Sequence, residues 1–218
     1  MYHGQYGIDK VIEDNYLEDL DSNGWMIECG AGDGISDSVC LHFEQEYGFR
    51  TINIDAVFSL YESLCHNRSN SINMFGALSS KNGQVDFVRA TKPNEMPGGS
   101  VSYKKEYDTY LIKNGYTLTN VGTPSFTYNN IYIFENTPLV NLFVLDVEGH
   151  ELEVIKGMTK SLPKVICVEY TLSGLEEIKQ VLIDKGYRFD FLSYNNALFS
   201  RGIPEKNWIG KTELWKGT

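Results

Sequence analysis

Four ionisable side chains lie within six residues, in the segment Asp146-Val147-Glu148-Gly149-His150-Glu151. The segment directly follows the apolar run Leu142-Phe143-Val144-Leu145, which has the composition of a parallel strand buried on both faces. Open α/β sheets bind their ligands at the carboxyl ends of such strands. A histidine titrates near neutral pH, and a carboxylate accepts protons and hydrogen bonds. We therefore predict that Asp146, Glu148 and His150 are candidate catalytic residues.

The general base is open among these three residues. His150 is the natural candidate, but burial could raise the pKa of Asp146 or Glu148 enough for either to act. Glu169, which ends the apolar run Val165-Ile166-Cys167-Val168, is the next candidate. Alternatively, Glu148 and His150 only cap a helix and hold loops in place. The four side chains would suit Mg²⁺ or Ca²⁺ only if water filled the remaining positions, so we predict no metal site and keep metal-assisted catalysis as a variant.

A glycine-rich turn is the second segment that could do chemistry. The stretch Glu28-Cys29-Gly30-Ala31-Gly32-Asp33-Gly34 follows an apolar pair and carries three glycines at alternate positions. Glycine is needed where the backbone takes a positive φ or comes close to a ligand. The pattern predicts a strand, a tight turn and a helix over 35–47, whose N-terminus would favour a negatively charged ligand group.

Two classes of nucleotide ligand compete for this turn, and a purely structural turn is the third possibility. Dinucleotide-binding folds need Gly-x-Gly-x-x-Gly, and Ile35 stands where that pattern needs its last glycine. The spacing Glu-x-Gly-x-Gly-x-Gly instead resembles the first motif of class I S-adenosylmethionine-dependent methyltransferases. Asp55, at the end of an expected strand over 51–55, could accept both hydroxyls of a ribose. The predicted cofactor-binding residues are Glu28, Gly30, Ala31, Gly32, Gly34, Asp55, Ala56, Ala77 and Asp146.

Length and charge limit the range of functions. At 218 residues the chain suits a single domain over 1–218, with 1–24 as an N-terminal helical segment. A formal net charge of −10 argues against non-specific binding to nucleic acid or to an anionic membrane. The apolar runs are too short to span a membrane, and the polar start is not a signal peptide. The chain has four cysteines without metal-ligand spacing, which indicates buried free thiols and a cytoplasmic protein: Cys29, Cys40, Cys65 and Cys167.

The remaining elements follow from periodicity and turn residues. Asn82-Gly83 predicts a hairpin that pairs the strand over 73–79 with the segment over 85–88. Helices are expected from Phe58, over 150–158 and from Leu175, and the last strand pair over 187–192 and 197–201. From 90 to 128 the periodicity disappears among glycines, prolines and aromatic rings. We predict an irregular excursion there that forms part of an acceptor pocket, with rings at Tyr103, Tyr107, Tyr110, Tyr116 and Phe126.

These motifs together resemble the FkbM family of methyltransferases. The resemblance rests on the glycine turn, on Asp146-Val147-Glu148-Gly149-His150-Glu151, on the Gly186-Tyr187 start of the last strand pair, and on the opening segment Gly4-Gln5-Tyr6-Gly7. One departure is Asp55-Ala56, where the family usually has Glu-Pro. The resemblance implies a Rossmann-like, seven-stranded, mostly parallel sheet with helices on both faces and an antiparallel last strand. It also implies S-adenosylmethionine as donor and O-methylation, often of sugars.

The acceptor side favours a hydroxyl group. Methyltransferases that act on exocyclic or amide nitrogens typically carry an Asn-Pro-Pro-Tyr or Asp-Pro-Pro-Tyr turn after the fourth strand, and this chain has Asp-Val-Glu-Gly there. Since the resemblance implies O-methylation that is often of sugars, a sugar, nucleotide-sugar or glycan acceptor is expected. A non-sugar small molecule is the alternative acceptor. A nicotinamide oxidoreductase and a non-catalytic binding protein of the same fold are the competing classes.

Overall fold

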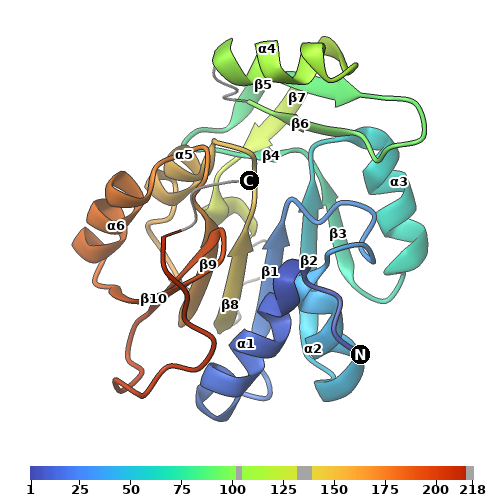
Figure 1. Cartoon of the computed structure of the whole chain (residues 1–218). Coiled ribbons are helices and arrows are strands. Elements are labelled where there is room, and N and C mark those ends of the chain that lie inside the picture. The colour runs from blue at the N-terminus through green and yellow to red at the C-terminus, as the bar shows by residue number, and fades with distance from the viewer. Residues whose placement is uncertain (102–104, 132–138, 215–218) are drawn as a thin grey trace.

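The computed structural model of the chain describes residues 1–101, 105–131 and 139–214 (Figure 1). Its strands are β1 (Trp25–Cys29), β2 (Arg50–Asp55), β3 (Ile72–Phe75), β4 (Ala77–Leu78), β5 (Gly83–Thr91), β6 (Gly98–Ser100), β7 (Thr117–Phe126), β8 (Val140–Leu145), β9 (Val165–Glu169), β10 (Arg188–Ser193) and β11 (Asn196–Ser200). Its α-helices are α1 (Ile8–Tyr16), α2 (Val39–Tyr47), α3 (Phe58–Asn67), α4 (Lys105–Lys113), α5 (Glu151–Lys156) and α6 (Leu175–Asp184). Short 3₁₀ helices are η1 (Gln5–Gly7), η2 (Leu17–Asp19) and η3 (Tyr128–Ile131).

Seven strands form the central sheet, in the order β10-β11-β9-β8-β1-β2-β3. β1 is parallel to β8 and β2, and β9 and β3 extend the parallel part on either side. β11 is antiparallel to both of its neighbours, β9 and β10. The predicted α/β fold, a mostly parallel seven-stranded sheet with an antiparallel last strand, is confirmed.

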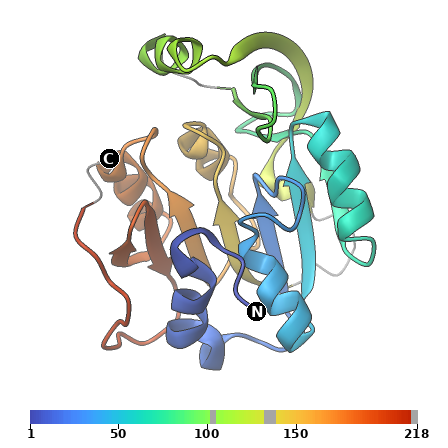
Figure 2. The same cartoon turned by 45° about the vertical axis from the view of Figure 1, so that its right-hand side comes forward.

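The inner strands are mostly apolar because helices cover both of their faces, with a few polar residues such as Glu28 in β1 and Asn141 in β8. Successive side chains of a strand point to opposite faces of the sheet. In β8, Leu142 and Val144 therefore pack with α1 and α2, whereas Phe143 and Leu145 pack with α5 and α6 (Figures 1 and 2). None of the described helices is both long and apolar enough to cross a membrane.

A second sheet of four strands, in the order β4-β7-β5-β6, lies with α4 over one end of the central sheet (Figure 1). The sequence analysis predicted an irregular excursion over 90–128. That prediction of irregular structure was wrong, because much of this segment forms the second sheet and α4. β5 and β7 pair antiparallel along nine residues, from Gly83↔Ser125 to Thr91↔Thr117. Most side chains of these two strands are exposed or half-buried, so the alternation of apolar and polar residues that marks a strand is weak here.

The hairpin predicted at Asn82-Gly83 was also wrong. β3 pairs in parallel with β2, and β4 pairs with the end of β7. The partners of β5 are thus not the strand before it but β6 and β7, and its pairs with β7 join residues that are 26 to 42 positions apart in sequence. A turn dipeptide reports the local bend but not which strand a segment will pair with.

The helix predicted over 35–47 begins only at Val39. Asp33 Oδ1 accepts hydrogen bonds of 2.8 Å from the backbone N–H groups of Ile35 and Ser36, which fixes a turn in place of a helical start. Asp37 has a φ of 58°, which a right-handed helix does not allow. The strand β9 and the starts of α3 and α6 coincide with the sequence predictions.

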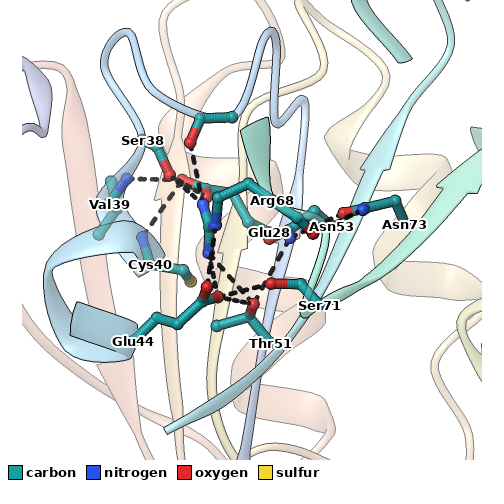
Figure 3. Close-up of polar contacts among 11 residues, drawn as sticks. Glu28, Ser38, Val39, Cys40, Glu44, Thr51, Asn53, Arg68, Ser71 and Asn73 are labelled. Carbon is teal, nitrogen blue, oxygen red and sulfur yellow. Dashed lines mark hydrogen bonds and ion pairs between the residues drawn. The ribbon is translucent and has the colours of Figure 1, made fainter. Parts of the chain in front are cut away.

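A buried polar cluster joins α2, α3 and β2 behind the glycine turn (Figure 3). The guanidinium of Arg68, only 2% exposed, donates to Glu44 at 2.6 Å, to the carbonyl oxygen of Gly34 at 3.0 Å, and to the hydroxyls of Ser38 and Thr51 at 3.1 Å each. Burial of Glu44 opposes its ionisation, but hydrogen bonds led by Arg68 outweigh this and lower the pKa of Glu44. Arg68 therefore ties the glycine turn to two helices.

Substitution Arg68→Met should destabilise the protein by about 3–5 kcal/mol, because it leaves Glu44 and the Gly34 carbonyl without their buried partner. Urea unfolding at pH 7 measures the loss. The matched control is Lys10→Met, which breaks the exposed ion pair with Asp14 and should cost less than about 1 kcal/mol. Equal losses in the two variants would show that the cluster does not hold the fold.

Candidate active site

A cavity of about 1130 Å³ lies between the carboxyl ends of the central strands and the second sheet. Residues from the turn after β1, the ends of β2, β8 and β9, and the insertion between β4 and β8 line it. Eleven of the predicted site residues lie in its wall: Glu28, Gly30, Ala31, Gly32, Asp55, Ala56, Ala77, Asp146, Glu148, His150 and Glu169. Gly34 does not border the cavity.

The glycine turn is shaped by close backbone approaches. A β-carbon on Gly30, whose φ is 86°, would lie 1.8 Å from the carbonyl oxygen of Asp146, so only glycine fits. A β-carbon on Gly34 would lie 2.6 Å from Leu64 and 2.7 Å from Arg68, so this glycine allows α3 to pack on the turn. A β-carbon on Gly32 would meet nothing closer than Met96, at 3.8 Å. Gly32 is thus the glycine that presents bare backbone to the cavity.

Asp55 links the end of β2 to this turn. Its carboxylate accepts hydrogen bonds from the backbone N–H groups of Gly32 at 2.8 Å and Val57 at 2.7 Å. Burial raises its pKa from 3.8 to about 6, although both hydrogen bonds favour the anion. Each oxygen keeps a further lone pair, so the carboxylate can still accept the hydroxyls of a ribose.

Glu28 has a local task that the sequence did not indicate. Its carboxylate accepts hydrogen bonds of 2.6 Å from the Ser38 hydroxyl and from the backbone N–H of Val39, and one of 3.4 Å from the N–H of Cys40 (Figure 3). These groups start α2, so Glu28 satisfies the free N–H groups of that helix from the neighbouring strand. Burial raises its pKa.

Three carboxyl groups meet at the ends of β8 and β9. One carboxylate oxygen each of Asp146, Glu148 and Glu169 lies within 4.8 Å of the others. Burial and the charges of Glu169 and Glu151 raise the pKa of Glu148 to about 7. Asp146 reaches solvent through the open cavity, yet the surrounding protein and then the charges of Glu169 and Glu148 raise its pKa well above its ordinary value. Burial and the repulsion between these carboxylates therefore favour protonated carboxyl groups near neutral pH.

Glu151 holds the backbone of the loop that carries Asp146 and Glu148. Glu151 Oε1 accepts hydrogen bonds from the backbone N–H groups of Val147 at 3.0 Å and Gly149 at 3.1 Å, and Oε2 accepts one from Ser173. Glu148 and Gly149 both have a positive φ, of 55° and 98°. These bonds compensate for the left-handed backbone of Glu148, which turns its side chain toward the cavity.

His150 lies apart from the three carboxyl groups. Its ring is buried, and its Nε2 forms a hydrogen bond of 3.1 Å with the Ser79 hydroxyl, beyond β4. Burial lowers the pKa of the imidazole, so the ring is neutral at pH 7. The structure thus brings together Asp146, Glu148 and Glu169 of the predicted catalytic residues, and places His150 at the N-terminus of α5.

The comparisons with known proteins identify the family. The sequence matches the family model described as the methyltransferase FkbM domain over residues 28–189, which is more than half of the chain. The chain belongs to the FkbM methyltransferase family. No curated protein matches the sequence.

Two solved structures resemble this FkbM family member in fold. The methyltransferase FkbM from Methylobacillus flagellatus KT is 13% identical, with a TM-score of 0.58 over 91% of this chain and 48% of that one. TrmK from M. capricolum, in complex with S-adenosyl-homocysteine, is 7% identical, with a TM-score of 0.50 over 94% of this chain and 72% of that one. The chain spans about half the length of the M. flagellatus protein.

The cavity wall of this FkbM family member includes residues that the sequence analysis missed. Gln5, Met96, Thr171 and Asn195 line the cavity, and none of them was predicted as a site residue. Asn195 could have been found from register alone, because the antiparallel pairing of β11 with β9 sets the adjacent Asn196 opposite Glu169. Met96 could not, since it reaches the glycine turn through the unpredicted second sheet.

The aromatic rings of the insertion divide into two sets. Tyr107 and Tyr110 of α4 line the cavity with their rings stacked at 5.8 Å. Burial and then the charges of Glu148 and Glu169 raise the pKa of Tyr107 to about 12. Tyr116 and Phe126 are not in the cavity wall. Tyr103 lies outside the described residues.

Glu148→Gln should stabilise the protein above pH 7. The folded state binds the Glu148 proton more tightly than the unfolded state, so stability falls as the pH rises from about 4.5 through about 7. Removing the charge should raise the free energy of unfolding by about 1–2 kcal/mol at pH 8. This is less than the whole pKa shift of Glu148 implies, because the cavity is open to solvent. At pH 4.5 the difference should vanish. Urea unfolding at both pH values measures it, with the exposed Glu205→Gln as control; a gain that does not depend on pH would contradict the assignment.

Proposed function

We propose that this FkbM family member is an O-methyltransferase whose acceptor is a hydroxyl group of a sugar or glycan. The observation that carries the proposal is the group of three carboxyl side chains, Asp146, Glu148 and Glu169, in the wall of the cavity that the glycine turn borders. A hydroxyl loses its proton as it attacks the methyl group, and a base that titrates near the working pH takes it best. Glu148, with a pKa of about 7, meets that condition.

The residues around the turn fit the donor. Gly32 leaves bare backbone for the methionine part, and Asp55 keeps lone pairs for the ribose hydroxyls. Ala56, Ala77 and Leu78 in the same wall offer small or apolar surface for a purine. When bound, S-adenosylmethionine supplies the electrophilic methyl group on a sulfonium.

We place the acceptor and the base on the side of the cavity opposite the glycine turn. The acceptor oxygen forms a bond to the methyl carbon while the carbon–sulfur bond breaks, and a carboxylate of the group takes the hydroxyl proton. Transfer is in line, so positioning supplies most of the acceleration. Tyr107 and Tyr110 give this side the aromatic surface that stacks on sugar rings, and Asn195 and Gln5 add hydrogen-bonding groups.

The charge of the cavity narrows the acceptor further. No lysine or arginine occurs among the lining residues in the described part of the chain, whereas six aspartates and glutamates do: Glu28, Asp37, Asp55, Asp146, Glu148 and Glu169. Phosphate groups are usually bound by arginine, lysine or helix N-termini. Among the expected acceptors, an uncharged or amine-bearing sugar therefore fits better than a nucleotide sugar. A non-sugar alcohol remains the alternative acceptor, and a non-catalytic binding protein the alternative function.

Gly32→Val should abolish donor binding and leave the fold intact, because the added side chain fills cavity space above the turn. Calorimetry with S-adenosylhomocysteine measures binding. Gly48→Val is the matched control: its φ of 70° is similarly positive, a β-carbon there meets nothing within 4 Å, and it lies at the far end of α2. Asp55→Ala should weaken binding by about 1–3 kcal/mol. Equal affinity for S-adenosylhomocysteine in the Gly32 and Gly48 variants would contradict the prediction that the donor binds at this turn.

Catalysis should depend on the carboxyl groups more than on His150. Asp146→Asn and Glu148→Gln should lower kcat by about 10²–10⁴-fold, as expected for loss of a base, and Glu148→Gln should keep its affinity for the uncharged S-adenosylhomocysteine. His150→Ala should cost less, since that imidazole lies apart from the group. Turnover is measured with three acceptors that share one sugar ring and differ in charge: glucose, glucosamine and glucose 6-phosphate.

Three outcomes would count against the proposal or against a part of it. Donor binding without transfer to any of the three acceptors, or to simple alcohols, would favour the non-catalytic protein. Preferred use of the phosphorylated acceptor would contradict the charge argument alone. A loss of turnover on chelation of divalent cations, restored by Mg²⁺, would favour the metal-assisted variant, for which the three carboxylates offer oxygen ligands.

A further inference from the structure

A chain of side-chain hydrogen bonds runs from β9 through the β10–β11 turn and back to Glu169. The thiol of Cys167 donates to Asn196 Oδ1 at 3.5 Å. Asn196 Nδ2 donates to Asn195 Oδ1 at 2.9 Å, and Asn195 Nδ2 donates to Glu169 Oε1 at 2.9 Å. Asn195 is 8% exposed and lies in the cavity wall. The chain thus ends on one of the three carboxyl groups.

The direction of these bonds follows from what each group can do. A carboxamide has an acceptor end and a donor end, and its orientation is decided by its partners. Burial, and then the charges of Asp146 and Glu28, raise the pKa of the Cys167 thiol, so it stays protonated and can donate. Asn196 must then turn Oδ1 to the thiol and its NH₂ group to Asn195. Asn195 in turn must point its NH₂ group at Glu169.

Glu169 receives a second hydrogen bond on the same oxygen. The Thr171 hydroxyl donates to Glu169 Oε1 at 2.9 Å. The NH₂ group of Asn195 also lies 3.4 Å from Gln5 Oε1 in the N-terminal segment. Hydrogen bonds donated to a carboxylate stabilise its charged form relative to its protonated form, so these bonds disfavour a proton on Glu169.

We propose that Asn195 is a positioning residue that holds Glu169 through its carboxamide and thereby directs proton uptake in the three-carboxyl group to Asp146 and Glu148. The inference rests on the proposed function, since it concerns which carboxyl group takes the proton of the acceptor hydroxyl. It assigns Glu169 the task of orienting and polarising its two neighbours. Thr171 assists Asn195 in this.

Asn195→Ala tests the assignment through the titration of Glu148, followed by carbon-13 NMR of the side-chain carboxyl groups in the protein without ligands. Glu148 should titrate near pH 7 in the wild-type protein. In the variant, Glu169 competes with Glu148 for the proton. A protonated Glu169 repels the Glu148 carboxylate less, so the midpoint of the Glu148 titration should drop by about one pH unit. The resonance is assigned by its loss in Glu148→Gln.

Asn141→Ala is the matched control. Asn141 is a fully buried asparagine at the opposite end of β8, and its carboxamide forms two hydrogen bonds, both with the Asp21 backbone. Both variants should lose stability, seen as lower urea midpoints, but only Asn195→Ala should move the Glu148 titration. An unmoved titration in Asn195→Ala would overturn the proposal and leave Asn195 a structural residue.

A second pair keeps the test decisive if Asn195→Ala does not fold. Thr171→Val removes the other donor to Glu169 and should move the Glu148 midpoint in the same direction, while Thr171→Ser keeps the hydroxyl and should not. Identical titrations in this pair would also count against the proposal. The titration needs neither donor nor acceptor, so its result stands apart from a failure of methyl transfer, which would overturn the proposed function instead.

Discussion

The contact between Gly30 and Asp146 is the constraint on which the rest of the site depends. The backbone of Asp146 occupies the space where any other residue at position 30 would place its β-carbon. Asp146 N–H also donates to the carbonyl oxygen of Cys29 at 3.0 Å, which continues the β1–β8 pairing past the strand ends. The glycine turn and the acidic loop are therefore fixed against each other through backbone, before any side chain is placed. This explains how two segments more than 100 residues apart in sequence form one cavity wall.

The central sheet and the glycine turn could be predicted because their signals are local and strong. Runs such as Leu142-Phe143-Val144-Leu145 have few alternatives to a strand covered on both faces, and a Gly-rich turn after β1 needs positive φ at fixed positions. The second sheet could not be predicted for the opposite reason. Its long β5–β7 pairing joins exposed, glycine-containing segments that are adjacent only in space. The second sheet is stabilised by that pairing and by its contact with the central sheet. Neither contact produces a periodic spacing of apolar residues in the sequence.

Within the site, residue identity was easier to predict than residue role. Glu28, Asp55, Asp146, Glu148 and Glu169 all lie in the cavity wall, yet their carboxylates differ in what they already bind. Glu28 accepts three hydrogen bonds from the start of α2, and Asp55 accepts two from backbone. Whether an acid supports the fold or faces a ligand depends on which donors surround it. Those donors come from elements far apart in sequence, so spacing alone does not reveal them.

The uncompensated charge of the three-carboxyl group has a physical counterpart in the proposed reaction. The group lacks a lysine or arginine partner among the lining residues that the structure describes, and burial together with the charges of neighbouring carboxylates raises the pKa of Glu148 to about 7. A donor with a sulfonium brings positive charge into the same cavity and relieves the repulsion, which favours its binding over that of the neutral thioether product. As the methyl group leaves, the positive charge on sulfur disappears. The carboxylate that takes the hydroxyl proton loses its negative charge in the same step, so the cavity ends with the same net charge with which it began. A neutral acceptor hydroxyl keeps this balance, whereas an amine acceptor would leave a positive charge on the product until it lost its proton.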